Sequence, residues 1–269
     1  MAVSGGIDSM VLLDMLAKTY DPASLVVAHF DHGIRPDSQR DATFVQQAAA
    51  RYGAVFETRR EELGANASEA LARNRRYTFL RELAEKYQAP IVTAHHLDDV
   101  VETAAINMTR GTGWRGVAAM SSAVQRPLLN QEKTELVAYA KKNHITWRED
   151  STNATDAYLR NRLRRKTSTM GSDQKRELLA LRAQQLYLKD EIEAEVHRLA
   201  GAGPEYERYF FTHVSPLVAL ECLRVVTKGR LTRPQLVRVL HAIKVARAGS
   251  VFEAGSGVKV HFSTRQFSL

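Results

Sequence analysis

The sequence predicts an α/β protein: a doubly wound, mostly parallel sheet, followed by a smaller, mainly helical domain that ends in a β-hairpin. Three observations predict it. Short apolar runs alternate with helical patterns through the first half, helical patterns fill most of the second half, and the last apolar run alternates around a Gly-Ser-Gly turn. Because 269 residues exceed one average domain, two domains are expected, 1–168 and 169–269.

The first domain is expected to alternate strands with helices. The expected strands are 2–3, 25–30, 54–57 and 89–94, and the expected helices are 10–16, 40–52, 68–87, 98–108 and 134–143. A short strand, 145–147, and a polar loop, 149–155, are expected after them. Ligands of parallel sheets bind at the carboxyl ends of strands. Ser4, His29 and His95 stand at or just beyond such ends, so one site is expected to collect them.

The second domain begins with a long helical pattern, 173–199, which glycines and Pro204 end. Two or three helices are expected within 213–247, where Ser215-Pro216 and Thr232-Arg233-Pro234 are start signals, and 251–262 is expected to form the hairpin. Cys222 and His241 lie in these helical patterns and are expected to be packing residues.

Composition limits the class of protein. The 44% apolar content supports a full core, and no run approaches the roughly 18 apolar residues that a membrane span needs. No secretory signal is visible, and the lone Cys222 excludes an internal disulfide and a C-x-x-C metal or redox pair. A cytoplasmic protein with no membrane partner is expected, and a homodimer stays open.

The net charge of +8 is unevenly distributed. Residues 1–165 hold 22 basic and 20 acidic residues, whereas residues 166–269 hold 16 and 10. No acidic residue lies between Glu221 and Glu253, a stretch with seven basic ones, and a second basic run spans 160–166. Such one-sided charge favours nucleic acid as the partner, although a solvated helix face is the alternative for either run.

The segment Ser4-Gly5-Gly6-Ile7-Asp8-Ser9 lies between the first apolar stub and a helix. Its glycines let the backbone approach a ligand, and the helix start offers unpaired N–H groups to an anion. Hydroxyls flank the loop, and Asp8 can help to hold a cation that bridges phosphates. No G-x-x-x-x-G-K-[ST] motif occurs. The loop therefore predicts a phosphate site, with an ordinary capped helix start as the alternative.

A second cluster, 93–103, leaves a strand and begins a helix with Asp98, Asp99 and Glu102 in or near its first turn. Acids favour helix starts, so capping is the alternative explanation for one or two of them. It does not explain the preceding histidines. A metal site of His95, His96 and Asp99 is disfavoured, because adjacent histidines point apart on regular backbone.

Two arginines, Arg73 and Arg76, share one face of an expected helix whose Tyr77 faces the core with residues 79–80. Near a nucleotide, a guanidinium can hold a phosphate in a forked geometry that lysine cannot match. A solvated basic patch is the alternative for these two residues.

The hexapeptide resembles S-G-G-x-D-S, the PP-loop of the Rossmann-like ATP pyrophosphatases, which cleave ATP to AMP and pyrophosphate. Further segments, in order, resemble the tRNA(Ile)-lysidine synthetases of that superfamily. They are 29–35, 72–77, 93–103, 110–116, 126–129, 149–153 and 160–164. The resemblance covers residues 2 to about 166, and the basic second half resembles the family's small domain in pattern.

This resemblance implies the substrates ATP, with Mg²⁺, free L-lysine, and the isoleucine tRNA with a CAU anticodon, whose wobble cytidine becomes lysidine through an adenylated intermediate. It implies catalytic roles for Asp8, Arg76 and Asp99. The other implied roles are ATP binding by Ser4, Gly5, Gly6, Ile7, Asp8, Ser9 and His29, Mg²⁺ binding by Asp8 through the ATP phosphates, lysine binding by Asp98, Asp99 and Glu102, and tRNA binding by Arg73, Arg110, Arg160, Arg162, Arg164 and Arg165.

The chain departs from the family in two respects. Only three residues precede Ser4, so the first strand is expected to be nearly missing, and the further C-terminal domain of longer family members is expected to be missing too. Three other functions stay open. Thiolation of tRNA would need catalytic cysteines, an amidotransferase or NAD synthetase would leave the basic half without a purpose, and a non-catalytic tRNA- or nucleotide-binding protein would not need Asp8, Arg76 and Asp99.

Overall fold

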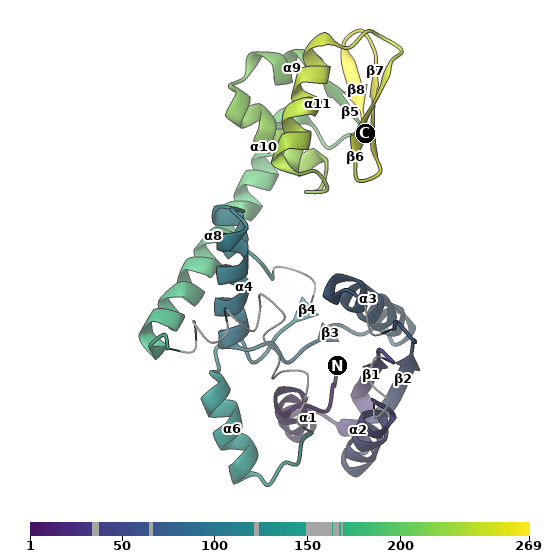
Figure 1. Ribbon diagram of the computed structural model, residues 1–269, viewed down its shortest axis with the longest axis vertical. Coiled ribbons are helices and arrows are strands. Elements are labelled where there is room, and N and C mark those ends of the chain that lie inside the picture. Colours follow the sequence, from purple (N-terminus) through teal and green to yellow (C-terminus); the bar gives the residue numbers. More distant parts are fainter. Residues whose placement is uncertain (34–37, 65–66, 121–123, 149–162, 164–166, 168) are drawn as a thin grey trace. The chain divides into compact units, whose positions relative to one another are not determined.

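A computed structural model describes residues 1–33, 38–64, 67–120, 124–148, 163, 167 and 169–269. The chain forms two compact units, Met1–Leu186 and Tyr187–Leu269, which are described separately (Figure 1). The expected domain boundary lies at residue 168, outside the described residues, and it stays a prediction.

The first unit alternates strands with helices, as the sequence predicts. Its elements are α1 (Ile7–Thr19), the 3-10 turn η1 (Pro22–Ser24), β1 (Val26–Asp31), α2 (Ser38–Tyr52), β2 (Val55–Arg60), α3 (Glu69–Lys86), β3 (Ile91–Val92), α4 (Leu97–Thr109), α5 (Trp114–Val117), β4 (Val124–Gln125), α6 (Lys133–Lys142) and the beginning of α8 (Ser172–Ala200). The strand expected at 145–147 is wrong. The Ile145 N–H bonds back to Ala140 O at 2.9 Å and closes α6, so the apolar pattern there reflects packing against the core.

The sheet is parallel, and residues 1–3 hold it together. β1 pairs with β2 from Val26↔Val55 onward, and β3 pairs with β4. Between the two pairs, Ala2 forms a single parallel bridge to Ala28, and its N–H donates to Val92 O at 2.8 Å. The spatial order is therefore β2, β1, residues 1–3, β3 and β4.

Helices cover both faces of this sheet. Along β1, Val27 packs with α1, α2 and α6, while the neighbouring Ala28 and Phe30 pack with α3. This alternation follows the two-residue period of a strand. Figure 1 shows α3 on one side of β1 and α1 on the other. The doubly wound α/β class is confirmed.

A buried carboxylate, Asp14, joins three helices behind the sheet. It accepts hydrogen bonds from Tyr52 Oη of α2, Tyr139 Oη of α6 and Lys18 Nζ of α1, each at 2.8 Å. Burial alone would raise the pKa of Asp14, but the hydrogen bonds from Lys18, Tyr139 and Tyr52 outweigh it and lower that pKa. The ionised carboxylate therefore fixes α2 and α6 against α1.

The second unit is a helical cluster on a small antiparallel sheet. Its elements are the end of α8, β5 (Glu205–Glu207), α9 (Arg208–His213), α10 (Pro216–Val226), α11 (Arg233–Val245), β6 (Val251–Gly255), β7 (Val258–Phe262) and β8 (Gln266–Ser268). The strands lie in the order β5, β8, β7, β6, so the expected hairpin, β6 and β7, is confirmed, and β8 and β5 extend its sheet on one side. Cys222 is buried in this core as expected.

The packing role expected for His241 is wrong. Leu236, Val239, Leu240 and Ile243 form the buried face of α11, and position 241 falls on the exposed side.

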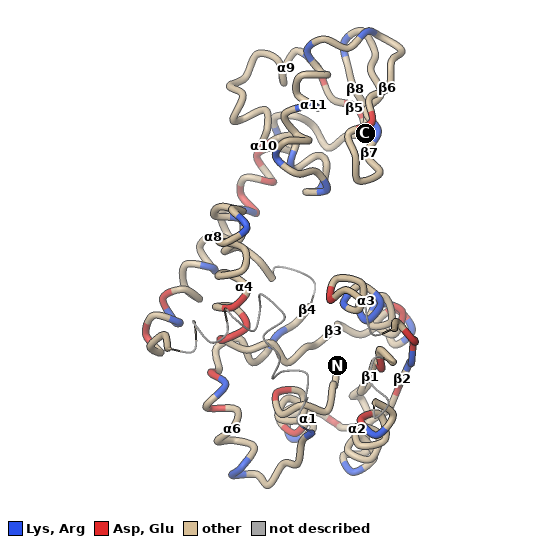
Figure 2. Tube along the Cα trace, viewed as in Figure 1, with Lys and Arg blue, Asp and Glu red and all other residues tan. Residues whose placement is uncertain are grey.

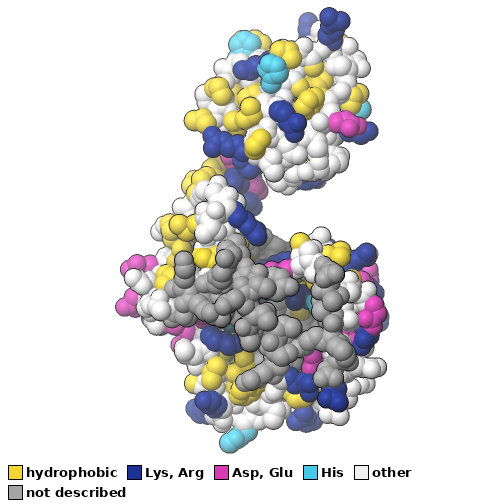
Figure 3. Space-filling view, in the orientation of Figure 1, with side chains coloured by type: hydrophobic (Ala, Val, Ile, Leu, Met, Phe, Trp, Pro, Cys, Tyr) yellow, Lys and Arg dark blue, Asp and Glu magenta, His cyan; other side chains and the backbone are white. Residues whose placement is uncertain are grey.

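The surface of the second unit mixes basic and apolar side chains (Figure 3). Of the seven basic residues between Glu221 and Glu253, all but Arg224 are exposed, and Leu217 and Tyr209 are also exposed. None of the helices in the described part of the chain is long and apolar enough to cross a membrane.

Candidate functional site

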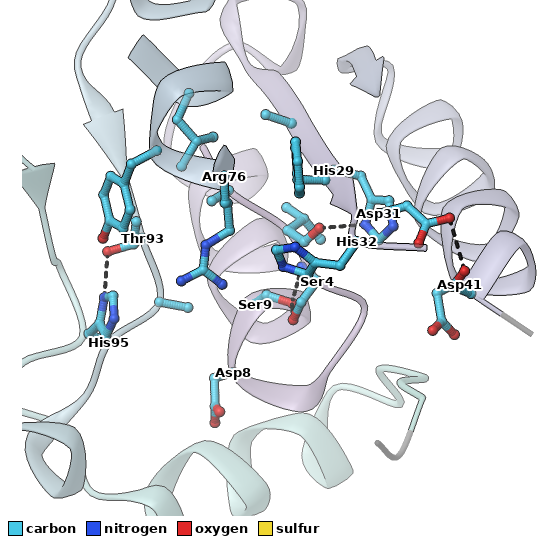
Figure 4. A pocket seen from close by; sticks show the side chains of 18 residues that line it. Ser4, Asp8, Ser9, His29, Asp31, His32, Asp41, Arg76, Thr93 and His95 are labelled. Carbon is cyan, nitrogen blue, oxygen red and sulfur yellow. Dashed lines mark hydrogen bonds between the residues drawn. The ribbon is translucent and has the colours of Figure 1, made fainter. Parts of the chain in front are cut away.

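A cavity of about 450 Å³ lies where residues 1–3, β1 and β3 end (Figure 4). Ser4, His29 and His95, which the topology predicts to meet, all line it. Helix α3 contributes Arg76, and α1 contributes Asp8 and Ser9. The cavity is thus built at the carboxyl edge of the parallel strands, where such sheets bind ligands.

The loop before α1 is shaped to receive an anion. Gly5 has a φ of +90°, a conformation that side chains disfavour. The Gly6 N–H donates to Ser4 Oγ at 3.3 Å, the Ser4 N–H donates to Ser9 Oγ at 3.2 Å, and Ser9 Oγ donates to Gly6 O at 2.8 Å. Gly6 caps α1 without a side-chain bond, so the first N–H groups of the helix stay available for phosphate oxygens.

Asp8 lies at the edge of the cavity, with 29% of its side chain exposed. Its Oδ1 is 2.6 Å from Lys133 Nζ, and its Oδ2 is 3.7 Å from His96 Nε2. The described residues contain no cluster of three or more groups arranged to hold a metal ion. Because Mg²⁺ is typically held by one or two carboxylates together with substrate phosphates, Asp8 beside an anion-binding loop fits that ion.

His96 is a buried histidine among three carboxylates of the site. Its Nδ1 is 3.4 Å from Asp98 Oδ2, and its Nε2 is 3.6 Å from Asp99 Oδ2 as well as 3.7 Å from Asp8 Oδ2. Burial would lower the pKa of His96, but the Asp98 hydrogen bond and the charges of Asp99 and Asp8 raise it above its usual value. The His96 ring thereby links the loop to the start of α4, whose acidic residues are red in Figure 2.

Asp98 is engaged by other parts of the first unit. Its Oδ1 accepts from Lys175 Nζ of α8 at 2.6 Å, and its Oδ2 accepts from the Lys133 N–H at 2.8 Å. Lys175 also donates to Glu132 at 3.2 Å. The contacts with His96 and Lys175 hold the pKa of Asp98 well below its usual range despite burial. Asp98 therefore joins α4, α6 and α8, and its expected lysine-binding role stays a prediction.

The arginines of α3 flank a buried tyrosine beside the cavity. The guanidinium carbons of Arg73 and Arg76 lie 4.9 and 5.7 Å from the centre of the Tyr77 ring. Figure 4 shows the Arg76 guanidinium pointing into the cavity, between His95 and Ser9. A guanidinium in this position can offset negative charge that develops on a phosphate.

His95 is neutral at physiological pH. Burial, opposed by Asp99 and supported by the charges of Arg126 and Arg73, lowers its pKa to about 4. Its Nδ1 is 2.7 Å from Thr93 Oγ1. A neutral imidazole at the cavity wall can exchange hydrogen bonds with a polar substrate.

The remaining predicted residues are distributed unevenly. Glu102 is buried in α4, one turn after Asp98 and Asp99. Arg110 caps the other end of α4, roughly 18 Å along the helix from Asp98, and it is not part of the cavity. The expected tRNA-binding residues Arg160, Arg162, Arg164 and Arg165 lie outside the described residues.

Three groups that the sequence does not assign to the site also lie in this region. Asp31 and Asp41 line the cavity, and Asp31 accepts hydrogen bonds from Arg60 and from Ser38. The position of Asp31 at the end of a predicted strand could have identified it. No sequence pattern identifies Lys133 as a site residue, because it lies 125 positions from Asp8 and only the packing of α6 in the fold brings it there.

Residues 1–169 match the PP-loop domain family. The chain belongs to this family. The chain is 41% identical over 171 residues to the tRNA(Ile)-lysidine synthase of Exiguobacterium sibiricum, and the aligned region covers 61% of this chain and 41% of that one. The Thermus thermophilus synthase is 42% identical over 172 residues, and the aligned region covers 61% of this chain and 34% of that one. The Enterococcus faecalis synthase is 32% identical over 250 residues, covering 79% of this chain and 54% of that one.

The resemblance to tRNA(Ile)-lysidine synthetases is thus confirmed, and the PP-loop chain spans about a third to a half of these relatives. Among solved structures, the U34-tRNA thiolase NcsA of Methanococcus maripaludis matches with a TM-score of 0.57 at 18% identity, over 70% of each chain. At that identity the match supports the fold alone.

Proposed function

We propose that the chain carries out ATP-dependent formation of lysidine on the wobble cytidine of the isoleucine tRNA with a CAU anticodon. One observation carries the proposal. An anion-binding loop, the Asp8 carboxylate and the Arg76 guanidinium meet at one cavity, in a chain similar to tRNA(Ile)-lysidine synthases.

In this proposal, ATP binds with its phosphates on the loop of residues 4–9. The N–H groups at the start of α1 and the hydroxyls of Ser4 and Ser9 would bind phosphate oxygens, and the Asp8 carboxylate would help to hold Mg²⁺. The ion, when bound, neutralises phosphate charge. His29 is 4% exposed, and its Nδ1 donates to Val3 O at 2.9 Å, which orients the ring at the cavity wall where the nucleoside would lie.

The first step would be adenylation of the cytidine. Its C2 oxygen attacks the α-phosphorus, a new O–P bond forms, and pyrophosphate leaves with the electron pair of the broken P–O bond. Arg76 points into the cavity and would stabilise the negative charge of this step.

The second step would be attack by lysine. Its ε-amine has an unperturbed pKa of about 10.4, so it must lose a proton before it attacks C2. Asp99 and Glu102 lie within the first two turns of α4 and would orient the ammonium, with Asp99 accepting the proton. The new C–N bond displaces AMP, which takes the electrons of the C–O bond.

The tRNA would be held by positive charge. Arg73 lies beside the cavity, and the exposed basic residues of α11 and its neighbours offer contacts to phosphates. Arg110, Arg160, Arg162, Arg164 and Arg165 are proposed for the same role. Each phosphate contact would appear as salt dependence of binding.

The proposal is tested by incubating the chain with ATP, Mg²⁺, labelled lysine and bulk bacterial tRNA. Nuclease digestion should then release a lysine-modified cytidine, detected by mass spectrometry. Folded protein that binds ATP and tRNA but transfers no lysine would contradict the proposal.

The Asp99→Asn variant tests the assigned base. It should bind tRNA as the unmodified chain does, yet lose about 10²-fold or more in turnover, since a general base contributes that much. Asp173→Asn is the matched control, because the Asp173 side chain is 96% exposed and should be silent. Loss of tRNA binding at an unchanged fold would refute the role.

A further inference from the structure

We propose that Lys133 is a further ATP-binding residue, whose ammonium leaves Asp8 and binds the phosphate chain when ATP enters the cavity. The inference rests on the ATP binding proposed above. It assigns a role to a residue that neither the loop motif nor the arginines of α3 explain.

The first argument is the contact itself. Lys133 Nζ lies 2.6 Å from Asp8 Oδ1, while 41% of its side chain stays exposed. In the free chain this ammonium neutralises the carboxylate next to the anion-binding loop. A bound nucleotide brings phosphate charge to the same place, and like charges there would repel unless a cation lies between them.

The second argument is how firmly the backbone of Lys133 is held. Its N–H donates to Asp98 Oδ2 at 2.8 Å, and Asp98 is in turn held by Lys175. Helix α6 packs its Leu136 and Ala140 into the core beside α1. The backbone is therefore fixed beside the first turn of α1, while the exposed side chain has room to turn by its own rotations.

The third argument compares the two basic side chains that contact Asp8, those of His96 and Lys133. His96 is 3% exposed and also contacts Asp98 and Asp99, so its ring cannot follow a ligand without giving up both of those contacts. Among the described residues, the Lys133 side chain forms an ion pair with Asp8, and 41% of it is exposed to solvent. The geometry thus keeps the His96 ring in place beside Asp8, whereas the Lys133 ammonium can move from Asp8 to a bound phosphate.

The test measures nucleotide binding by calorimetry, without any turnover. Lys133→Met should weaken ATP binding at least ~10-fold, whereas Lys133→Arg, which keeps the charge, should stay within ~3-fold of the unmodified chain. AMP binding should change less than ~3-fold in both variants, because the contact is to the phosphate chain. Lys142→Met, an exposed lysine at the end of the same helix, is the matched control.

A second arm separates contact with ATP from neutralisation of Asp8. In an Asp8→Asn background, with EDTA present, adding Lys133→Met should still weaken ATP binding at least ~5-fold. If the loss disappears there, or if ATP and AMP are weakened equally, Lys133 acts through Asp8 and the proposal is overturned. An unmodified chain that binds no ATP would instead contradict the proposed function. Circular dichroism confirms that each variant is folded.

Discussion

Replacing Lys175 by methionine tests the ion-pair cluster that joins α4, α6 and α8. The Lys175 side chain is 8% exposed, and its partners Asp98 and Glu132 are 22% and 10% exposed. Removing one partner from a buried pair typically costs 3–5 kcal/mol because a charge stays behind. Here Asp98 keeps His96 and the Lys133 N–H, so we expect the free energy of unfolding of the first unit to fall by about 2–3 kcal/mol.

Tryptophan fluorescence in a urea titration measures this loss. Both tryptophans, Trp114 and Trp147, belong to the first unit, so their emission follows its unfolding. With a slope of about 2.5 kcal/mol/M, the midpoint should fall by ~1 M. Lys142→Met on exposed α6 surface should leave it unchanged. A Lys175→Met shift as small as that of the control would refute the reasoning.

Three further predictions concern groups outside this cluster. Tyr139→Phe removes one hydrogen bond to the Asp14 carboxylate and should cost about 1.5 kcal/mol in urea unfolding, against no change for the exposed Tyr20→Phe; equal effects would contradict it. Burial raises the pKa of Cys222 to about 11, so thiol reagents at pH 8 should label the native chain at least ~100-fold more slowly than the urea-unfolded chain, and fast native labelling would contradict this. Because the pKa of His95 in the folded chain is about 4, the unfolded chain takes up a proton between pH 6.5 and 4 that the folded chain does not, so stability is lost as the pH falls through that window. His95→Gln should remove up to about 3 kcal/mol of this loss of unfolding free energy. An unchanged dependence of stability on pH in this variant would contradict the assignment.

The sequence predicts the parts of this molecule that depend on local patterns. Apolar periodicity and caps locate α2, α3, α4, α6 and α8 within a residue or two, whereas α1 extends three residues beyond the expected 10–16 at each end. At the start of α3, for example, Ser68 accepts a hydrogen bond from the Leu71 N–H. The loop of residues 4–9 is identified by glycines, hydroxyls and a following helix, all adjacent in the chain. The three-residue strands β5 and β8 are missed, because segments so short carry almost no periodicity.

The contacts that organise the site are mostly long-range, and no local pattern contains them. Lys175 and Asp98 are 77 positions apart, and Lys133 and Asp8 are 125 apart. Each pair forms because α6 or α8 brings a lysine next to a carboxylate. The residues adjacent to these carboxylates in the sequence indicate a role in substrate or ion binding and give no sign of the lysine. The sequence therefore predicts that the acidic residues of α4 bind the amine of a substrate, whereas one of them, Asp98, binds Lys175 of the same chain.

The segment Met1–Val3 also determines when the sheet can close. Its partner β1 follows soon after it, but its other partner, β3, comes after α2, β2 and α3. During synthesis residues 1–3 can pair with β1 early, yet their other edge stays open until β3 has left the ribosome. Pairing over such a long loop costs chain entropy and is slow. Assembly of β3 and β4 onto this edge is thus expected to be the late step in forming the cavity.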